Sequence, residues 1–539
     1  MSLSSQPQSA ETYRLGIDVG GTNTDAVILD SANRVIAKTK SPTTQDVTSG
    51  ILNALRRVLE ESRLSPKAIR FAMLGTTHCT NAIATRNGLT RVGVIRLGAP
   101  ATLAVPPLAT WPTDLREICL VESFILPGGH EYNGEEISPL DFDELRDVAR
   151  RLKGRVKAIA IVGVFSPVNQ DHELQVRDFL RKELDDNVAI TLSSEIGSVS
   201  LIERENAAAL NATLVEVARV AIGGFEKAIR ELNMDATLFL GQNDGTLMSV
   251  DYALEYPIYT VASGPANSIR GAAFLSGLRD AMIVDIGGTT SDLGILQKGF
   301  PRESAVAVEI GGVRTNFRMP DLISIGLGGG SRIHQDGSIR VGPDSVGYRL
   351  TQEALVFGGK QITATDLAVA AGRASIGDAR RVKDLPPALV KEGLAYVSGR
   401  LEESIDRMKL TAELIPVVVV GGGSILFPDK VAGVSEVVRP PNFDVANALG
   451  VAIAQVSGTV DRIFAQEGMS RQQALEEATR SARERTIAAG ADPDTIEILE
   501  IEEVPLAYLP GHALRIKVKA AGALQAANSA VSLGGKARA

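Results

Sequence analysis

The sequence has few aromatic residues, little cysteine and no dense run of basic residues. Aromatic residues make up 4% of the 539 residues, while hydrophobic residues of all kinds make up 44%, so we expect cores that are mainly aliphatic. The net charge is −8, and without a lysine- and arginine-rich segment a nucleic-acid-binding protein is not expected. No apolar run reaches the roughly 18 residues of a membrane-spanning helix, so no membrane partner is expected.

Cysteine and histidine are too sparse to suggest a metal or disulfide framework. The two cysteines, Cys79 and Cys119, can form at most one disulfide, which favours a reducing, cytoplasmic location. The five histidines are scattered, so no zinc cluster is expected. Residues 1–12 are polar and do not resemble a signal peptide. We expect these residues and the tail 524–539 to be disordered.

Glycine, in contrast, is abundant, and many of the 52 glycines follow apolar stretches. This placement suits a backbone that approaches a ligand closely. At roughly 100–200 residues per domain, the length predicts two large lobes with additional elements. We expect an N-terminal lobe over 13–280, a second lobe over 281–460, and a C-terminal helix and strand pair over 461–523.

A long-range internal repeat is the strongest feature of the sequence. Residues 16–29 read GIDVGGTNTDAVIL, and residues 284–296 read VDIGGTTSDLGIL. When Asp18 is aligned with Asp285, the Gly-Gly-Thr triplets align, and a second aspartate follows seven residues later in each copy (25 − 18 and 292 − 285). Each copy predicts a β-hairpin with a glycine-rich tip. Two related halves indicate two lobes that face a shared cleft.

Around the two copies, apolar strands alternate with helices, which predicts an α/β architecture. Buried strands are predicted over 156–165 and 417–424. A final strand pair over 495–519 is expected to turn at Pro510 and Gly511 and to cap a lobe. Helices are predicted over 46–62, 171–186, 203–232, 385–410, 444–457 and 470–489. The helix over 203–232 is expected to break near Gly223 and Gly224.

The two hairpins predict a site for a nucleoside triphosphate. Backbone N–H groups at a glycine turn can surround phosphates, and threonine hydroxyls can donate to phosphate oxygens. A carboxylate in the same loop is repelled by phosphate unless a divalent cation lies between them, so Asp18 and Asp285 are predicted to organise magnesium. The alternative is a pair of ordinary glycine turns capped by aspartates. The predicted phosphate-binding residues are Gly20, Gly21, Thr22, Asn23, Thr24, Gly287, Gly288, Thr289, Thr290 and Asp292.

A third glycine segment follows a predicted strand and comprises Gly421, Gly422, Gly423 and Ser424. Glycines at the end of a strand let a base or ribose lie against the backbone, so this segment is the predicted adenosine site. The helix that follows offers a face of small residues on which another helix can pack closely: Ala446, Ala448, Gly450 and Ala452.

Candidate substrate residues are polar residues at the ends of predicted elements. Thr76, Thr77, His78 and Asn81 follow a strand and could line the cleft; the alternative is a helix N-cap beside a solvated histidine. His78 is also a catalytic candidate, as a group that could activate water. Glu205 and Asn206 could activate water or hold a ring amide; the alternative is a solvated helix face. Ser263 is a further candidate, or only the start of a helix. The glycine-rich residues 326–331 predict a loop that lines the cleft rather than a flexible linker.

The order of these signatures resembles that of actin, the sugar kinases and the heat-shock ATPases. This resemblance implies a two-lobed α/β fold with duplicated ribonuclease-H-like domains and a nucleotide cleft between them. A narrower resemblance, to hydantoinase A and the ATP-dependent oxoprolinases, rests on seven blocks in one order. They are GIDVGGTNTD (16–25), LGTTHCTNAI (74–83), ERENAAALNATL (203–214), SGPANSIRGA (263–272), VDIGGTTSDLG (284–294), IGLGGGSRIHQDGSIRVGPDSVG (325–347) and TATDLAVAAGR (363–373).

The narrower resemblance implies ATP- and Mg²⁺-dependent opening of a cyclic amide of the hydantoin, oxoproline or lactam type, by phosphorylation of the amide oxygen. It also implies an oligomer and a separately encoded hydantoinase-B-like subunit. Residues 348–360 lack the Pro-Gly-Pro and Tyr-Gly pattern of the family, which leaves the substrate open. Three alternatives remain: a small-molecule kinase on the same fold, a subunit of an ATP-dependent carboxylase, and a non-enzymatic ATP-driven activator.

Overall fold

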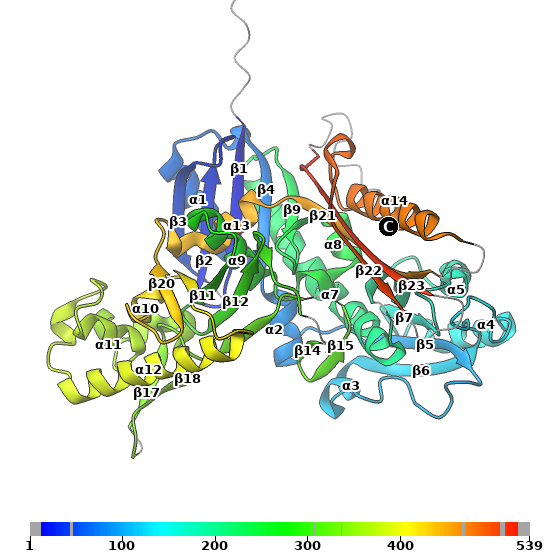
Figure 1. Cartoon of the computed structure of the whole chain (residues 1–539), viewed down its shortest axis with the longest axis horizontal. Helices are drawn as coiled ribbons and strands as arrows, with labels where there is room; N and C mark the ends of the chain where they lie inside the picture. The colour runs from blue at the N-terminus through cyan, green and yellow to red at the C-terminus, as the bar shows by residue number, and fades with distance from the viewer. Residues whose placement is uncertain are drawn as a thin grey trace, which may run out of the picture.

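The computed structural model describes residues 12–43, 47–197, 199–304, 308–317, 319–335, 337–464, 469–506 and 513–525. Most of both predicted tails, and the Pro510–Gly511 turn, lie outside these ranges. The described chain forms sheets of nine, six and four strands, with helices packed around them (Figure 1). This is the mixed α/β architecture that the sequence predicts.

The first hairpin belongs to the nine-stranded sheet, in the order β22-β23-β21-β10-β9-β4-β1-β2-β3. The final strand pair, expected to cap a lobe, therefore extends the edge of this sheet. The strands are β1 (Tyr13–Val19), β2 (Asn23–Leu29), β3 (Val35–Pro42), β4 (Ile69–Thr76), β9 (Thr237–Gly241), β10 (Leu247–Ser249), β21 (Val456–Phe464), β22 (Glu497–Pro505) and β23 (Leu514–Gly522).

The second hairpin belongs to the six-stranded sheet, in the order β13-β12-β11-β19-β20, with β16 paired to β12. Strand β1 is antiparallel to β2 and parallel to β4, and β11 is likewise antiparallel to β12 and parallel to β19. The two repeat copies thus hold the same position in their sheets. The strands are β11 (Ala281–Ile286), β12 (Ser291–Gln297), β13 (Phe300–Pro301), β16 (Leu322–Ile325), β19 (Ile415–Val420) and β20 (Val434–Val438).

The third sheet has the order β6-β5-β7-β8, and all its pairings are parallel. Its strands are β5 (Val92–Ala99), β6 (Leu120–Pro127), β7 (Ala158–Gly163) and β8 (Ala189–Leu192). Strand β7 is the buried strand predicted over 156–165. Two short hairpins are separate: β14 (Val308–Ile310) with β15 (Val313–Thr315), and β17 (Ser331–His334) with β18 (Arg340–Ser345).

Each of the six predicted helices is present, with shifted ends. The helix expected over 444–457 stops at Ile453, because the chain from Val456 joins the first sheet as β21. The helices are α1 (Val47–Ser62), α2 (His78–Thr85), α3 (Thr113–Cys119), α4 (Phe142–Leu152), α5 (Asp171–Glu183), α6 (Ser193–Ile196), α7 (Leu201–Glu231), α8 (Val250–Glu255), α9 (Ser263–Ser276), α10 (Leu350–Glu353), α11 (Ala364–Ala370), α12 (Pro387–Met408), α13 (Ala446–Ile453) and α14 (Arg471–Ala488).

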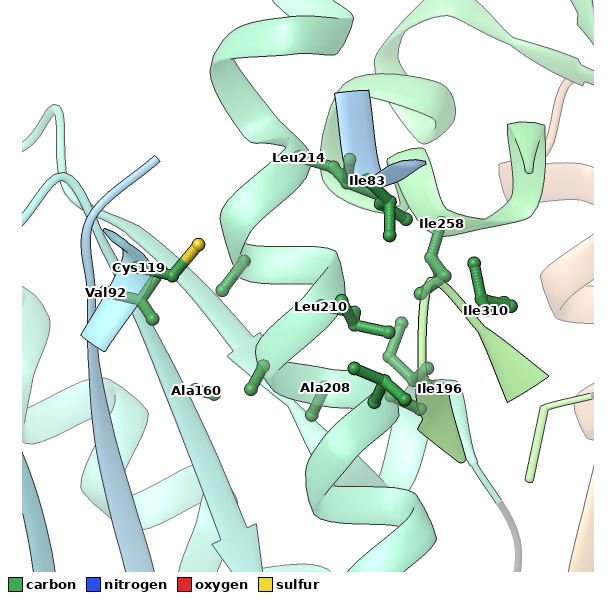
Figure 2. Close-up of a cluster of buried hydrophobic side chains, with 14 of the residues drawn as sticks. Ile83, Val92, Cys119, Ala160, Ile196, Ala208, Leu210, Leu214, Ile258 and Ile310 are labelled. Atoms are coloured by element: carbon green, nitrogen blue, oxygen red, sulfur yellow. The ribbon is translucent and has the colours of Figure 1, made fainter. Parts of the chain in front are cut away.

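Helix α7 runs without the predicted break at Gly223 and Gly224. A Cβ on Gly224 would lie 2.8 Å from Thr48 Oγ1 of α1, so this glycine allows close helix packing rather than ending the helix. Leu210 and Leu214 of α7 pack in a core with Ile83 and Ile258 (Figure 2). By length and composition α7 could cross a membrane, but 72% of its most apolar window is buried inside the protein, and core packing accounts for its hydrophobicity.

Helices α9 and α13 pack backbone against backbone, as the small-residue face predicts. A Cβ on Gly271 would lie 1.9 Å from the carbonyl oxygen of Ala446, and a Cβ on Gly450 would lie 1.8 Å from that of Asn267. No side chain fits at either position without separating the helices. This contact carries polar residues of both helices to the two hairpins.

Candidate functional site

The two hairpins have the same turn geometry, and their tips meet. Gly20 N donates to Asn23 O at 3.0 Å, and Gly287 N donates to Thr290 O at 2.9 Å. The Oγ1 atoms of Thr22 and Thr289 lie 3.2 Å apart. The structure therefore brings the predicted phosphate-binding residues of both copies together, and their contact with phosphate stays a prediction: Gly20, Gly21, Thr22, Asn23 and Thr24 from the first, and Gly287, Gly288, Thr289 and Thr290 from the second.

Four aspartates lie at the bases of the hairpins, since Asp18 is paired in register with Asp25 and Asp285 with Asp292. Asp18 is 4% exposed and Asp285 is 8% exposed. Burial, and then the charge of Asp25, raises the pKa of Asp18 to about 7. Burial also raises the pKa of Asp285, and that of Asp292 to about 6. A nearby cation would stabilise the ionised form of these buried carboxylates.

One cation from the chain is already at this cluster. Lys40 Nζ lies 2.6 Å from Asp25 Oδ2, which pairs the second aspartate of the first hairpin. Asp18 receives a weaker contact from Asn447 Nδ2, at 3.4 Å from its Oδ2. Asp18 therefore lacks the directly bound cation that Asp25 has in Lys40.

The structure adds a residue to which the sequence assigns no role, Asn267 of α9. Within the described residues, both polar side-chain atoms of Asn267 and the Oδ1 atom of Asp18 are buried without a hydrogen-bond partner. A Cβ on Gly75 would lie 2.5 Å from Asp18 Oδ1 and 2.7 Å from Asn267 Nδ2. Buried polar atoms are normally satisfied, so this donor and acceptor set fits a hydrated cation such as Mg²⁺.

Asn267, its neighbour Ser268 and Asn447 were inconspicuous in the sequence, because they lie on helices far along the chain from Asp18. Burial is the largest cause of the raised pKa of Asp285, and hydrogen bonds with Ser268 and Asn447 lower that pKa in part. The close packing of α9 and α13 brings these residues to both hairpins. For Asn267 and Ser268 the available signal was the resemblance block over 263–272, whereas Asn447 lies outside all seven blocks.

The remaining glycine segments support the second hairpin. Gly421 has φ +85°, and a Cβ there would lie 2.2 Å from Asp285 Oδ1; Gly423 N donates to Ile286 O at 2.7 Å. Residues Gly421–Ser424 thus lie beside the second hairpin, and contact of Gly422 and Ser424 with adenine remains a prediction. Gly329 N and Gly330 N donate to Gly287 O and Gly288 O at 2.9 and 2.7 Å. The loop over 326–331 therefore lines the site, as predicted.

Several predicted substrate residues lie at the end of β4, which is the strand beside β1 of the first hairpin. Thr76 is paired in register with Val19, and Ser263 Oγ donates to Thr76 O at 3.1 Å. Thr77 Oγ1 donates to Val19 O at 3.3 Å, and Asn81 Nδ2 donates to Thr77 Oγ1 at 3.3 Å. Ser263 is also the first residue of α9, so the helix-start interpretation is correct, and its role toward a substrate stays a prediction.

His78 is partly buried, and the alternative of a solvated histidine is wrong. Its Nδ1 atom forms a hydrogen bond with Thr76 Oγ1, and burial lowers the pKa of His78. A neutral imidazole beside the first hairpin is compatible with a proton-accepting role. The predicted roles of these polar residues toward a substrate stay predictions.

The structure does not bring Glu205 and Asn206 to the hairpins, which corrects their assignment as catalytic and substrate residues. Glu205 forms a two-fold ion pair with Arg96, with both N–O distances at 2.7 Å and both side chains 0% exposed. Its Oε1 atom also accepts from Leu108 N at 2.9 Å. Asn206 Nδ2 donates to Thr110 Oγ1 at 2.9 Å. Both residues are buried, so the alternative of a solvated helix face is equally wrong.

The pH dependence of stability should report on Asp18. Its folded pKa of about 7 exceeds the ordinary 3.8, so between these values the folded protein binds more protons than the unfolded chain. The free energy of unfolding should therefore fall as pH rises through this window, by roughly 4 kcal/mol from this group. Urea denaturation at pH 5 and pH 8 should show a smaller decrease in Asp18→Asn than in wild type.

Asp30→Asn is the matched control, because hydrogen bonds from Arg34 and Ala32 lower the pKa of Asp30. A lowered carboxyl pKa contributes stability that is lost on acidification, so this variant should keep the Asp18-dependent decrease above pH 5. An identical pH dependence in wild type and Asp18→Asn would contradict the prediction.

The chain belongs to the hydantoinase/oxoprolinase family. The family model for the hydantoinase/oxoprolinase N-terminal region matches residues 14–184, and the hydantoinase/oxoprolinase model matches residues 204–378. The acetophenone carboxylase gamma subunit of Aromatoleum aromaticum is 28% identical over 392 residues, covering 66% of this chain and 53% of that protein. The caprolactamase subunit alpha of Pseudomonas jessenii is 27% identical over 397 residues, covering 68% and 55%.

The chain thus spans about half the length of these two relatives. Among solved structures, the ATP-dependent caprolactamase from Pseudomonas jessenii has a TM-score of 0.72 at 20% identity, covering 95% of this chain and 88% of that one. A nucleotide-free acetone carboxylase has a TM-score of 0.68 at 17% identity, covering 96% and 89%. At these identities the likeness establishes a shared fold.

Proposed function

We propose that the chain is an ATP-dependent enzyme that opens a cyclic amide of the hydantoin, oxoproline or lactam type. The observation that carries the proposal is the pair of equivalent hairpins, whose tips meet above four aspartates. Asp18 Oδ1 and the Asn267 amide there have no protein partner within the described residues. The caprolactamase and 5-oxoprolinase among the relatives act on substrates of this chemical type.

An unstrained amide is stabilised by resonance, so ring opening needs activation. ATP with Mg²⁺ would supply a phosphoryl group for the amide oxygen, which makes the carbonyl carbon electrophilic and provides a good leaving group. Asp18, Asp285 and Asn267 would hold the hydrated cation. The N–H groups of Gly21 and Gly288, with the threonine hydroxyls, would hold and orient the phosphates, while the N–H groups of Gly20 and Gly287 close the two turns.

An ATP-dependent carboxylase subunit is the second candidate, because the acetophenone and acetone carboxylase subunits are also relatives. The same hairpin site would serve either reaction, since an activated carbonyl oxygen is common to both. The two functions differ in the partner reagent, which is water for a hydrolase and bicarbonate for a carboxylase.

The relatives are named as alpha, beta and gamma subunits, and we propose a hydantoinase-B-like partner for this chain. The residues at the hairpins include candidates for nucleotide binding and one imidazole, that of His78. Glu205 is no longer a candidate for activating water, because it is paired with Arg96 in the core. A separate subunit would supply the missing group. A cytoplasmic location, an oligomeric assembly and the predicted lobe boundaries remain proposals.

Phosphate release from ATP tests the reaction class. Hydantoins, lactams, sugars and ketones should be compared, with and without bicarbonate, using the isolated chain and the chain with its co-purified partner. We expect substrate-dependent release with a cyclic amide, independent of bicarbonate, and only weak turnover by the isolated chain.

Release that needs a ketone and bicarbonate would favour the carboxylase, and release with a sugar would favour the kinase. Strong turnover of a cyclic amide by the isolated chain would remove the need for a partner. ATP binding without turnover of any substrate, even after co-purification, would favour the non-enzymatic activator.

A further inference from the structure

A cavity, called here the inner cavity, lies apart from the hairpins, between α6, the β9–β10 turn, β21 and α14. Its volume is about 100 Å³. Glu195 of α6 and Arg485 of α14 line this cavity and also line two adjoining hollows of about 310 and 240 Å³. One acidic and one basic side chain therefore lie where three spaces meet.

Arg485 has most of its hydrogen-bonding capacity available to a ligand. Its Nη1 atom donates to Thr459 O at 3.0 Å. Within the described part of the chain Arg485 has no ion pair with a carboxylate, and the charge of Glu195 acts on it only at longer range. A guanidinium carries five N–H donors in a planar fork. The natural partner for such a fork is a carboxylate bound through two parallel hydrogen bonds.

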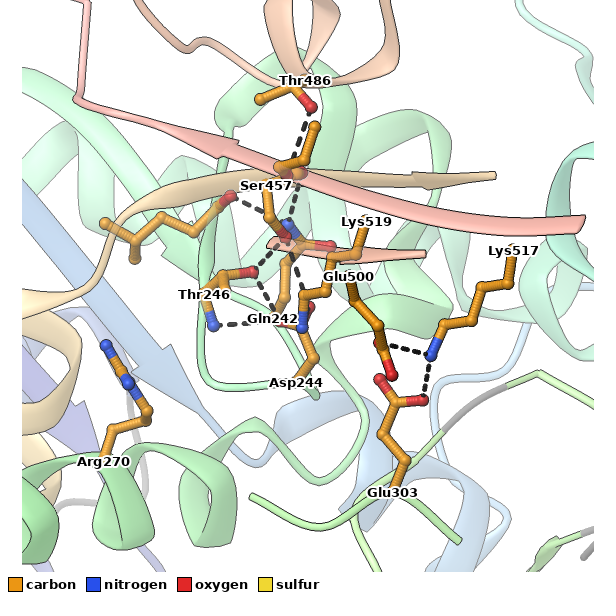
Figure 3. A network of polar contacts seen from close by, with 12 residues as sticks. Gln242, Asp244, Thr246, Arg270, Glu303, Ser457, Thr486, Glu500, Lys517 and Lys519 are labelled. Atoms are coloured by element: carbon orange, nitrogen blue, oxygen red, sulfur yellow. Dashed lines mark hydrogen bonds and ion pairs between the residues drawn. The ribbon is translucent and has the colours of Figure 1, made fainter. Parts of the chain in front are cut away.

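Two of the four carboxylates that line this cavity are paired with lysines. Lys519 Nζ lies 2.8 Å from Asp244 Oδ2, and Lys517 Nζ lies 2.8 Å from Glu303 Oε2 (Figure 3). Glu195 differs, because its Oε2 atom accepts a hydrogen bond from the Tyr256 hydroxyl at 2.6 Å rather than from a cation. Asp461, the remaining carboxylate of the lining, is paired with Arg515 at 2.5 Å. Among the described residues, the charged groups of the lining without an ion pair are thus Arg485 and Glu195, which act on each other only at longer range.

The smaller adjoining hollow has an excess of negative charge. Glu195, Asp251 and Glu255 line it together with Arg485, so its ionised side chains sum to −2 (three carboxylates and one guanidinium). Such a hollow favours a cationic group. The rings of Tyr252 and Tyr259, whose centroids are 6.4 Å apart, line the inner cavity and suit a short aliphatic chain.

We infer that this cavity binds a short linear amino acid, with its carboxylate on Arg485 and its ammonium group toward Glu195, Asp251 and Glu255. The inner cavity, at about 100 Å³, is smaller than the roughly 150 Å³ apolar cavity that holds benzene. It therefore limits the ligand to a few carbon atoms, with one charged end in the acidic hollow.

This ligand has the chemistry of an opened lactam. When the amide C–N bond breaks, water supplies a hydroxyl to the carbon and a proton to the nitrogen, which leaves a carboxylate and, after protonation, an ammonium group on one chain. The identification of the ligand as a reaction product rests on the proposed function. The binding site itself rests on the cavity and its charges.

Calorimetric titration of the full-length protein without nucleotide tests the inference. The ligands are 5-aminopentanoate, pentanoate and pentylamine, which differ only in their charged ends. We expect 5-aminopentanoate to bind at one site, about tenfold or more tightly than either analogue. Arg485→Gln and Glu195→Gln should each weaken this binding about tenfold or more. Arg480→Gln, on the exposed side of α14 with a side chain 64% exposed, should leave it unchanged.

Equal binding of pentanoate, absence of 5-aminopentanoate binding, or full affinity in folded Arg485→Gln would overturn the inference. If Arg485→Gln fails to fold, as judged by circular dichroism, Glu195→Gln and the ligand series decide. Asp18→Asn should bind 5-aminopentanoate normally. Binding retained without ATP-dependent opening of any cyclic amide, with the co-purified partner present, would refute the proposed function alone. Lactam opening without such binding would refute the cavity assignment alone.

Discussion

Replacing Asp18 or Asp285 by asparagine should lower ATP turnover by about 100-fold or more in a protein that remains folded. Asparagine keeps the shape of the side chain and removes the charge assigned to the cation. Burial raises the pKa of both carboxyls, so the ionised forms are costly in the unliganded protein and their loss should not destabilise it. Turnover, nucleotide affinity and urea denaturation should be measured for each variant.

Asp280→Asn is the matched control, because Asp280 directly precedes β11 and its exposed carboxylate accepts only from the Lys298 backbone N–H, at 3.0 Å, among the contacts described. It should leave turnover unchanged. Normal turnover in Asp18→Asn or Asp285→Asn would remove that residue from the site. Loss of the fold in either variant would instead support aspartates that merely cap the glycine turns.

The hairpin repeat could be predicted because its determinants are local. Each copy contains a buried strand, a glycine turn and a second strand within fourteen or fewer consecutive residues, at 16–29 and at 284–296. The equal spacing of the aspartates then requires equal register, which the pairs Asp18–Asp25 and Asp285–Asp292 show. The close packing of α13 was also predictable, since Gly450 and its small neighbours permit a backbone approach that larger side chains would prevent.

The rest of the site depends on partners far apart in sequence. Asn447 is 429 residues from Asp18, and Arg96 is 109 residues from Glu205. The sequence around Glu205 does not distinguish a catalytic carboxylate from one that forms an ion pair in the core. The difference lies in its partner, Arg96, which is far away in the sequence. Gly224 presents the same difficulty: its role is to admit Thr48 from another helix, whereas the local pattern indicates a break.

Replacing Glu205 by alanine should lower the free energy of unfolding by about 3–5 kcal/mol. The guanidinium of Arg96 is 0% exposed, and without the carboxylate it would remain buried with an uncompensated charge. The same variant should keep the ATP turnover of its folded fraction, because Glu205 is held in the α7 core and not at the hairpins. Urea denaturation, with turnover normalised to folded protein, measures both effects.

Glu203→Ala is the control on the same helix. Glu203 is 3.9 Å from Arg314, whose side chain is 67% exposed, and an exposed pair of this kind contributes about 0–1 kcal/mol. The double variant Arg96→Met with Glu205→Leu should recover part of the lost stability, since an apolar pair needs no compensation for buried charge. A Glu205→Ala protein that is as stable as wild type but has lost turnover would return Glu205 to the catalytic candidates.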